Sequence, residues 1–93
     1  MDMNNKRVAI IGLGIEGVAL CDFLIDKAGS ITVLEKMPLA TILEKAEPEL
    51  AKKILETSKN SRIEFVFGDN YLEQLESFDI IFRSPSFYFN DED

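Results

Sequence analysis

Four short apolar runs divide the chain, and their length and composition are typical of β-strands. They cover residues 8–11, 31–34, 63–67 and 78–82 and are rich in β-branched and aromatic side chains. The first run, Val8 to Ile11, contains no polar residue. A strand of a parallel sheet that is covered on both faces needs apolar side chains on both, so this run is expected to be a central strand.

The segments between these runs carry apolar residues at helical spacing. After the first strand, apolar positions recur every three or four residues from Val18 to about Ala28, which predicts a helix that stops at Gly29. Residues 39–59 show a second helical pattern, which is highly charged. Pro48 disfavours α geometry in the residue before it, so this pattern is expected to form two helices, with the proline in the first turn of the second.

The stretch between the third and fourth strands begins with a turn at Gly68, Asp69 and Asn70. Asn70, followed three positions later by Glu73, predicts a capping pair for a short helix through Leu75. Strands that alternate with helices over short connections predict an α/β fold, a three-layer Rossmann-like parallel sheet of at least four strands with flanking helices. Ligands of such sheets bind beyond the carboxyl ends of the strands, where four segments are expected to converge. These segments are residues 12–17, 35–36, 68–70 and 83–86.

The length and charge of the chain limit what it can do. Its 93 residues suffice for a single domain, residues 1–93, with one core. The formal net charge of -7 argues against nucleic-acid binding, which needs clusters of lysine and arginine. An anionic ligand is therefore expected to be held mainly by backbone dipoles. No stretch is long and apolar enough for a signal sequence or a membrane span, so no membrane partner is expected.

The cysteine and histidine content excludes two further kinds of site. Cys21 is the only cysteine and histidine is absent, so neither an internal disulfide nor a metal site of the usual nitrogen and sulfur type is expected. Cys21 lies on the apolar stripe of the first helix, where a small core residue is a better interpretation than a nucleophile. A reducing, cytoplasmic setting fits these features best.

A glycine-spaced loop follows the first strand and opens the first helix, with the sequence Gly12-Leu13-Gly14-Ile15-Glu16-Gly17. In this pattern the first glycine permits a tight turn, the second lets backbone approach a phosphate, and the third lets the helix pack close to the strand. The free amides near Ile15, Glu16 and Gly17 would then face an anion. The loop is interpreted as a site for a phosphate ester, and a purely structural turn is the alternative.

Two carboxylates lie near this loop in the predicted fold. Glu35 follows the second strand, at the position from which a carboxylate accepts hydrogen bonds from a ribose diol, and a solvated acid at a strand end is the alternative. Glu16, in contrast, disfavours a bound diphosphate, because a carboxylate close to the diphosphate is repelled unless its side chain turns outward. The loop must then work through its amides. These features alone suit a nicotinamide-dinucleotide domain.

The fourth strand and its exit favour a different family. Together with Val8–Gly17 and Gly68–Leu72, the stretch Phe78–Pro85 resembles the amino-terminal domain of the Mur ligases, in particular those that add D-glutamate to UDP-N-acetylmuramoyl-L-alanine. The resemblance spans nearly the whole chain. Its most specific part is the Arg-Ser-Pro sequence at the end of the fourth strand, residues 83–85. The family usually continues with glycine after this sequence, whereas this chain has Ser86. The connection from Pro38 to Asn60 has no counterpart that the resemblance identifies.

The resemblance implies that the chain anchors the UDP part of a sugar substrate. In this family a central domain binds ATP and a third domain brings the amino acid, so ATP and Mg are expected in the central domain and no cofactor in this one. The implied partners are UDP-N-acetylmuramoyl-L-alanine and the remaining ligase domains in cis. Asp69 has the alternative role of a helix cap. The residues implied to surround the UDP are Gly14, Ile15, Glu16, Gly17, Glu35, Lys36, Gly68, Asp69, Asn70, Ser84 and Pro85.

The sequence contains neither a GxxxxGK[ST] motif nor a substitute for the catalytic lysines and metal ligands of the later domains. The chain is therefore expected to be an excised domain of an ATP-dependent ligase that catalyses nothing alone. A nicotinamide-binding regulatory module of the kind that gates potassium transport is the main alternative, because it shares the glycine loop, the acid after the second strand and Gly-Asp after the third. The Arg-Ser-Pro exit disfavours this alternative. A scaffold whose glycine loop is only a turn is the third interpretation.

Overall fold

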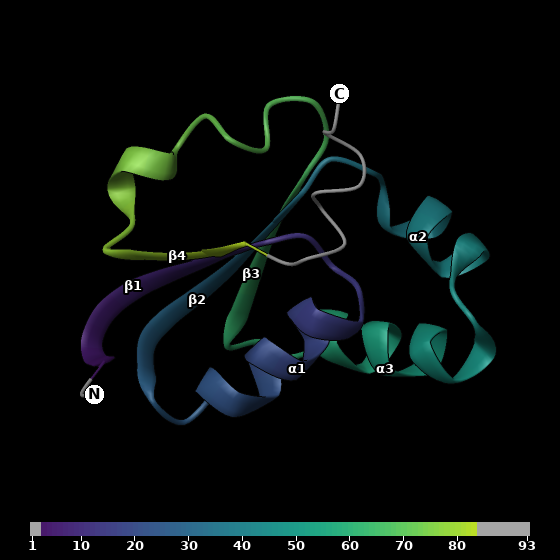
Figure 1. Ribbon diagram of the computed structural model, residues 1–93, viewed down its shortest axis with the longest axis horizontal. Coiled ribbons are helices and arrows are strands. Elements are labelled where there is room, and N and C mark those ends of the chain that lie inside the picture. Colours follow the sequence, from purple (N-terminus) through teal and green to yellow (C-terminus); the bar gives the residue numbers. More distant parts are fainter. Residues whose placement is uncertain (1–2, 84–93) are drawn as a thin grey trace.

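A computed structural model describes residues 3–83, which form a four-stranded sheet with helices packed on it (Figure 1). The strand order is β3-β2-β1-β4 and every pair is parallel, which confirms the predicted Rossmann-like α/β fold. The elements in chain order are β1 (Met3–Ile11), α1 (Ile15–Leu24), β2 (Ala28–Glu35), α2 (Leu39–Lys45), α3 (Pro48–Ser58), β3 (Ile63–Phe67), the 3-10 helix η1 (Leu75–Ser77) and β4 (Ile80–Arg83).

The strand β1 lies in the middle of the sheet, as its apolar sequence predicts. It pairs with β2 on one side and β4 on the other, and Val8, Ala9 and Ile10 are fully buried. The start of β4 is held to β1 by a reciprocal pair of bonds. The N–H of Arg7 donates to Asp79 Oδ2 at 2.8 Å, and the N–H of Asp79 donates to the carbonyl oxygen of Arg7 at 2.8 Å.

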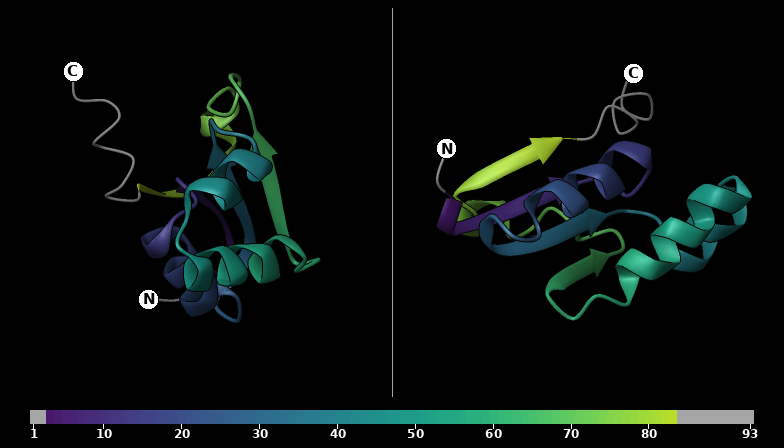
Figure 2. Two further views of the ribbon diagram at one scale, coloured as in Figure 1. Left: turned by 90° about the vertical axis from the view of Figure 1, so that its right-hand side faces the viewer. Right: turned by 90° about the horizontal axis from the view of Figure 1, so that it is seen from below.

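Three helices cover one face of the sheet and enclose the larger core. Figures 1 and 2 show α1 and α3 side by side on this face, with α2 beyond them. The helix α1 contributes Val18, Cys21 and Leu24 to this core, and α3 contributes Ile54. The helices thus bury most of the apolar stripes that the sequence periodicity predicts, although Leu55 of α3 is 40% exposed.

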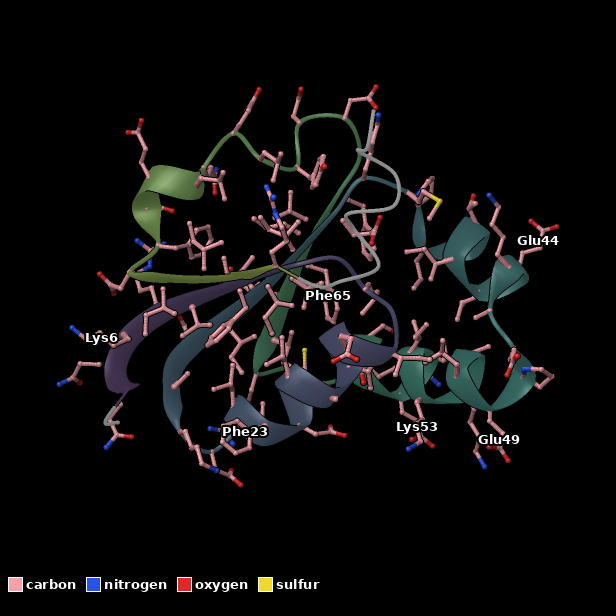
Figure 3. All side chains as sticks on the ribbon, in the orientation of Figure 1. Lys6, Phe23, Glu44, Glu49, Lys53 and Phe65 are labelled. Atoms are coloured by element: carbon pink, nitrogen blue, oxygen red, sulfur yellow. The ribbon has the colours of Figure 1, made fainter. Side chains whose placement is uncertain are left out.

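Pro48 separates α2 from α3, as predicted. Glu47 before it has an extended backbone, with φ of -65° and ψ of 154°, and Pro48 is the first residue of α3. This is the arrangement that proline favours, because its ring excludes α geometry one residue earlier and suits the first helical turn. The charged side chains of this helical pair are exposed, and Figure 3 shows Glu44 and Glu49 on its outer side.

The opposite face of the sheet is covered by the connection from β3 to β4, which includes η1 (Figures 1 and 2). The predicted helix beginning at Asn70 is wrong. The N–H groups of Tyr71 and Glu73 donate to the carbonyl oxygens of Gly68 and Asn70, so this stretch forms consecutive turns. Residues 68–79 must run from the carboxyl end of β3 across the sheet to the amino end of β4. A helix advances only about 1.5 Å per residue and covers less of that distance than turns and extended backbone do.

The helix α1 ends at Leu24, earlier than the predicted end near Ala28. Ala28 and Gly29 instead belong to β2, which pairs with the beginning of β1. A Cβ atom on Gly29 would lie 2.6 Å from the carbonyl oxygen of Asn4. Gly29 therefore permits two strands to approach each other rather than marking the end of a helix.

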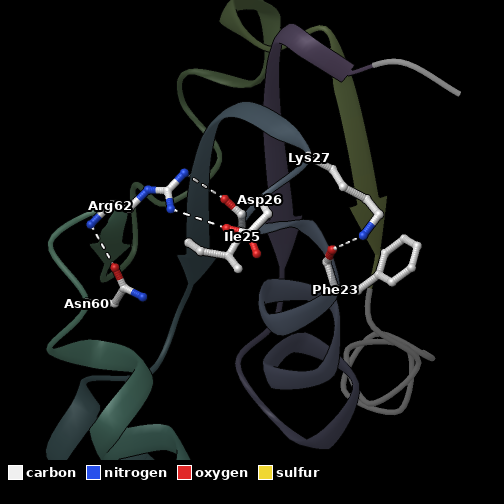
Figure 4. A network of polar contacts seen from close by, with 6 residues as sticks. All are labelled: Phe23, Ile25, Asp26, Lys27, Asn60 and Arg62. Atoms are coloured by element: carbon white, nitrogen blue, oxygen red, sulfur yellow. Dashed lines mark hydrogen bonds and ion pairs between the residues drawn. The ribbon is translucent and has the colours of Figure 1, made fainter.

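Arg62 connects the end of α1 to the turn before β3 (Figure 4). Its Nη2 donates to the carbonyl oxygen of Ile25 at 2.8 Å, and its Nη1 lies 3.5 Å from Asp26 Oδ1. The side-chain oxygen of Asn60 accepts the N–H of Arg62 at 2.9 Å. A cation at the carboxyl end of a helix satisfies an unpaired carbonyl and the helix dipole together. Because the Arg62 and Asp26 side chains are 60% and 83% exposed, the ion pair itself adds little stability.

Candidate functional site

The carboxyl ends of the four strands meet at one edge of the sheet. Ile11, the last residue of β1, pairs with Leu34 of β2 and with Arg83 of β4, while Glu35 pairs with Phe67 at the end of β3. The segments that follow β1, β2 and β3 are therefore neighbours, and the end of β4 lies beside the end of β1. The strand order reverses direction between β1 and β4, and ligands of open α/β sheets bind outside the carboxyl ends at such a point.

The glycine loop after β1 is a tight turn packed against the sheet. Gly12 has a φ of 104°, a conformation that favours glycine, and its N–H donates to the carbonyl oxygen of Leu34 at 2.9 Å. A Cβ atom on Gly17 would lie 2.3 Å from the carbonyl oxygen of Gly12, closer than any side chain permits. The predicted roles of the first and third glycines, the tight turn and the close packing of helix on strand, are therefore confirmed.

The first turn of α1 presents backbone donors at this edge. The N–H of Val18 donates to the carbonyl oxygen of Gly14 at 2.9 Å, so the amides of Ile15, Glu16 and Gly17 precede the first bond of the helix. Gly14 is the N-cap and has no side chain to occupy them. The side chains of Ile15 and Glu16 are exposed. Free amides at the positive end of a helix attract anions, which is the chemistry that the sequence pattern predicts.

The carboxylate of Glu35 lies between the glycine loop and the turn after β2. Its Oε1 accepts the N–H of Leu13 at 2.8 Å, and its Oε2 accepts the N–H of Met37 at 3.0 Å. Glu35 is half-buried, whereas its neighbour Lys36 is exposed. The bond to Leu13 is a feature of the site that sequence reasoning missed. It joins residues 22 positions apart, and only the pairing of β1 with β2 brings them together.

The connection after β3 begins with Gly68, which has a φ of 110° and donates its N–H to the carbonyl oxygen of Glu35 at 3.0 Å. Asp69 and Asn70 follow it and are exposed. No helix of the described chain begins at either residue, so the alternative role of Asp69 as a helix cap is unsupported. A small cavity of about 150 Å³ lies beneath this connection. It is lined by Leu34, Val66, Asn70, Tyr71, Glu73 and Gln74.

Two larger hollows lie between α1 and α3. One, of about 340 Å³, extends from Ile15 to Glu47 and Glu49 at the beginning of α3. The other, of about 260 Å³, lies further along the two helices, beside Asp22 and Glu56. Lys53 lines both hollows, but carboxylates outnumber it in each, so neither suits an anionic ligand as well as the amides of the first turn of α1 do.

Cys21 borders one of these hollows but is itself buried, with 1% of its surface exposed. Burial, and then the charge of Asp22, raise the pKa of its thiol to about 11. Because the thiolate is the nucleophilic form, this thiol is inert at neutral pH. The prediction that Cys21 is a core residue is confirmed.

The structure gathers nine of the predicted site residues at the carboxyl edge of the sheet. They are Gly14, Ile15, Glu16, Gly17, Glu35, Lys36, Gly68, Asp69 and Asn70. Ser84 and Pro85, the other two, lie outside the described residues. Within residues 3–83, no three His, Cys, Asp or Glu side chains are grouped so as to hold a metal ion, and no helix is long and apolar enough to cross a membrane.

Curated relatives of one kind align with almost the whole chain. They include the UDP-N-acetylmuramoylalanine–D-glutamate ligases of Clostridium tetani, Clostridium novyi and Clostridium botulinum, which are 42%, 34% and 33% identical to it. These alignments cover 88%, 90% and 94% of the chain but only 16%, 16% and 17% of the respective relatives. No family profile and no solved structure matches the chain.

Proposed function

Because the chain belongs to the family of the UDP-N-acetylmuramoylalanine–D-glutamate ligases, we propose that it is the amino-terminal domain of such an enzyme and binds the UDP part of the substrate. The short share of each relative that it spans supports its being one domain of a longer protein. The proposed ligand is UDP-N-acetylmuramoyl-L-alanine, which the relatives' name implies as the acceptor of D-glutamate.

The observation that carries this proposal is the set of free amides in the first turn of α1, behind a glycine loop at the carboxyl edge of the sheet. In the proposal the amides of Gly14, Ile15, Glu16 and Gly17 hold the diphosphate. The net charge of the chain is -7, which by itself disfavours an anionic ligand. Backbone donors overcome this locally, because they attract an anion without a cationic side chain. The exposed Glu16 side chain is compatible with this arrangement, since solvent screens its charge.

The other strand ends surround the rest of the ligand in the proposal. Glu35 and Lys36 lie beside the uridine, Gly68 to Asn70 close the other side, and Ser84 with Pro85 border the crevice. Another domain of the full-length enzyme binds ATP and Mg. The full-length enzyme joins D-glutamate to the substrate in the cytoplasm and forms ADP. The chain alone anchors the substrate and is inactive.

Titration of the isotope-labelled 93-residue chain with UDP, followed by NMR, tests the proposal. Chemical-shift changes are expected to concentrate at the amides of Ile15, Glu16 and Gly17, because the diphosphate contacts them directly. Uridine is the matched control ligand, because it lacks the phosphates and is expected to shift these amides much less. NADH tests the alternative of a nicotinamide-binding domain. No response at millimolar UDP, or a stronger response to NADH, would contradict the proposal.

A further inference from the structure

Glu35 connects three of the segments at the carboxyl edge of the sheet. Its carboxylate accepts the N–H of Leu13 in the glycine loop at 2.8 Å and the N–H of Met37 in the turn after β2 at 3.0 Å. Its carbonyl oxygen accepts the N–H of Gly68, the first residue after β3, at 3.0 Å. Each oxygen of this one residue thus binds a main-chain donor of a different segment.

Leu13 is the residue through which Glu35 acts on the glycine loop. The Leu13 side chain is 4% exposed and belongs to the core beneath the helices, and glycines flank it on both sides. Glycine adopts many backbone conformations, so a glycine-rich loop keeps one shape only where other contacts fix it. The buried side chain of Leu13 and its bond to a charged acceptor provide two such contacts directly before the first turn of α1.

We propose that Glu35 is a positioning residue of the anion site. It fixes the Gly12–Gly17 loop through the N–H of Leu13 and so keeps the amides of Ile15, Glu16 and Gly17 in the orientation that binds a diphosphate. This role rests on the proposed function. It differs from a direct contact between the carboxylate and a ribose or a base, because the carboxylate acts on the phosphates through the loop.

Positioning and charge make opposite predictions for Glu35. A carboxylate near a bound anion repels it, so by charge alone its removal strengthens binding. By positioning, any change that breaks the bond to Leu13 weakens binding, whether or not the charge is kept. Glu35→Asp separates the two effects, because it keeps the charge and shortens the side chain by one methylene.

Affinity for UDP and for inorganic pyrophosphate is the first measurement. Glu35→Asp is expected to bind both about tenfold more weakly than the wild-type chain, because the N–H of Leu13 loses a charged acceptor. Glu44→Gln is the matched control, since it removes a charge from an exposed side chain on the outer side of α2 and leaves Glu35 and the glycine loop in place. It is expected to bind both ligands as tightly as the wild type, because solvent screens an exposed charge that lies away from the site.

Hydrogen exchange of the Leu13 amide in the free protein is the second measurement, and it needs no ligand. Exchange is expected to be faster in Glu35→Asp, whose shorter side chain moves the acceptor away from Leu13, and in Glu35→Gln, whose neutral amide oxygen is a weaker acceptor than a carboxylate. It is expected to be unchanged in Glu44→Gln. The amide of Ile10, in the middle of β1, is expected to stay protected in all three variants. Its protection shows that the sheet is intact.

Three outcomes decide the proposal. Wild-type affinity together with unchanged Leu13 exchange in Glu35→Asp would overturn it. Weaker UDP binding with unchanged pyrophosphate binding in Glu35→Asp would also overturn it, because that pattern means direct contact of Glu35 with the nucleoside. If the wild-type chain binds neither UDP nor pyrophosphate, the proposed function fails, and Leu13 exchange still decides whether Glu35 fixes the loop.

Discussion

The two faces of the sheet share the central strand β1 but are covered in different ways. On one face, Val8 and Ile10 pack beneath three helices, each of which satisfies its interior backbone hydrogen bonds and presents an apolar stripe. On the other, Ala9 and Ile11 pack beneath the β3–β4 connection, which is held by turns and anchored by Tyr71. A regular cover resists rearrangement, whereas a connection of turns collapses more easily onto a space left beneath it.

This difference extends to the candidate site. The glycine loop and the first turn of α1 belong to the helical face, while Gly68, Asp69 and Asn70 belong to the connection on the other face. The donors proposed to bind the diphosphate therefore lie on the half with the helical cover, which we expect to be the more rigid. The residues proposed to close the site lie on the half that we expect to adapt more easily, an arrangement suited to substrate entry.

Ile10→Ala and Ile11→Ala test most directly whether the two covers differ in rigidity, because the two residues are adjacent on β1, equal in size and 0% and 2% exposed. Ile10→Ala is expected to lower the free energy of unfolding by about 4 kcal/mol, since the helices cannot close the cavity, and Ile11→Ala by about 2 kcal/mol. Urea denaturation measures both. Equal losses would show that the two covers are equally rigid.

Gly17 on the helical face and Gly68 on the β3–β4 connection allow the same test at the candidate site. Gly17→Ala is expected to lower the free energy of unfolding by about 3 kcal/mol, because its Cβ meets the carbonyl oxygen of Gly12 at 2.3 Å. Gly68→Ala meets no atom within 4 Å and suffers only from its φ of 110°, so a loss of about 1 kcal/mol is expected. Thermal denaturation and UDP titration of both variants test this. Retained UDP binding in Gly17→Ala would argue against close packing as a requirement of the site.

The remaining expected effect, which is absent at neutral pH, is a pH dependence of the helical face. The pKa of the Cys21 thiol is raised from 9.0 to about 11, by burial and then by Asp22, so the folded chain holds this proton to higher pH than the unfolded chain does. The resulting stabilisation is complete below pH 9 and is lost as the pH rises toward 11. The free energy of unfolding of the wild type, relative to Cys21→Ala, is expected to fall over this range. A constant difference would mean that the thiol titrates normally.

Much of the fold could be predicted from the sequence, because local patterns determine it. The strand at 63–67 and the division of the helical region at Pro48 were both predictable in this way. The end of α1 was not, because Gly29 serves a contact with Asn4 on another strand. The irregular stretch after Asn70 was not predictable either, since it depends on the distance between two strand ends.

The candidate site likewise combines features that could be predicted from the sequence with features that could not. The roles of Gly12 and Gly17 follow from their spacing, because the turn and the helix start are local structures. The position of Glu35 at the end of a strand was also predictable. Its bond to Leu13 was not, because it depends on the register of β2 against β1 and on the side-chain conformation. Contacts of the site with UDP stay predictions.

The paired bonds between Arg7 and Asp79 have a consequence for biosynthesis. The two residues are 72 positions apart, so one edge of β1 has no strand partner until the segment around Asp79 has left the ribosome. An unpaired edge of an apolar strand is a template for pairing with other chains. Because such non-local pairing forms slowly, this edge of β1 stays unprotected until β4 has been synthesised and has paired with it, and the interval before then is when two copies are most prone to aggregate.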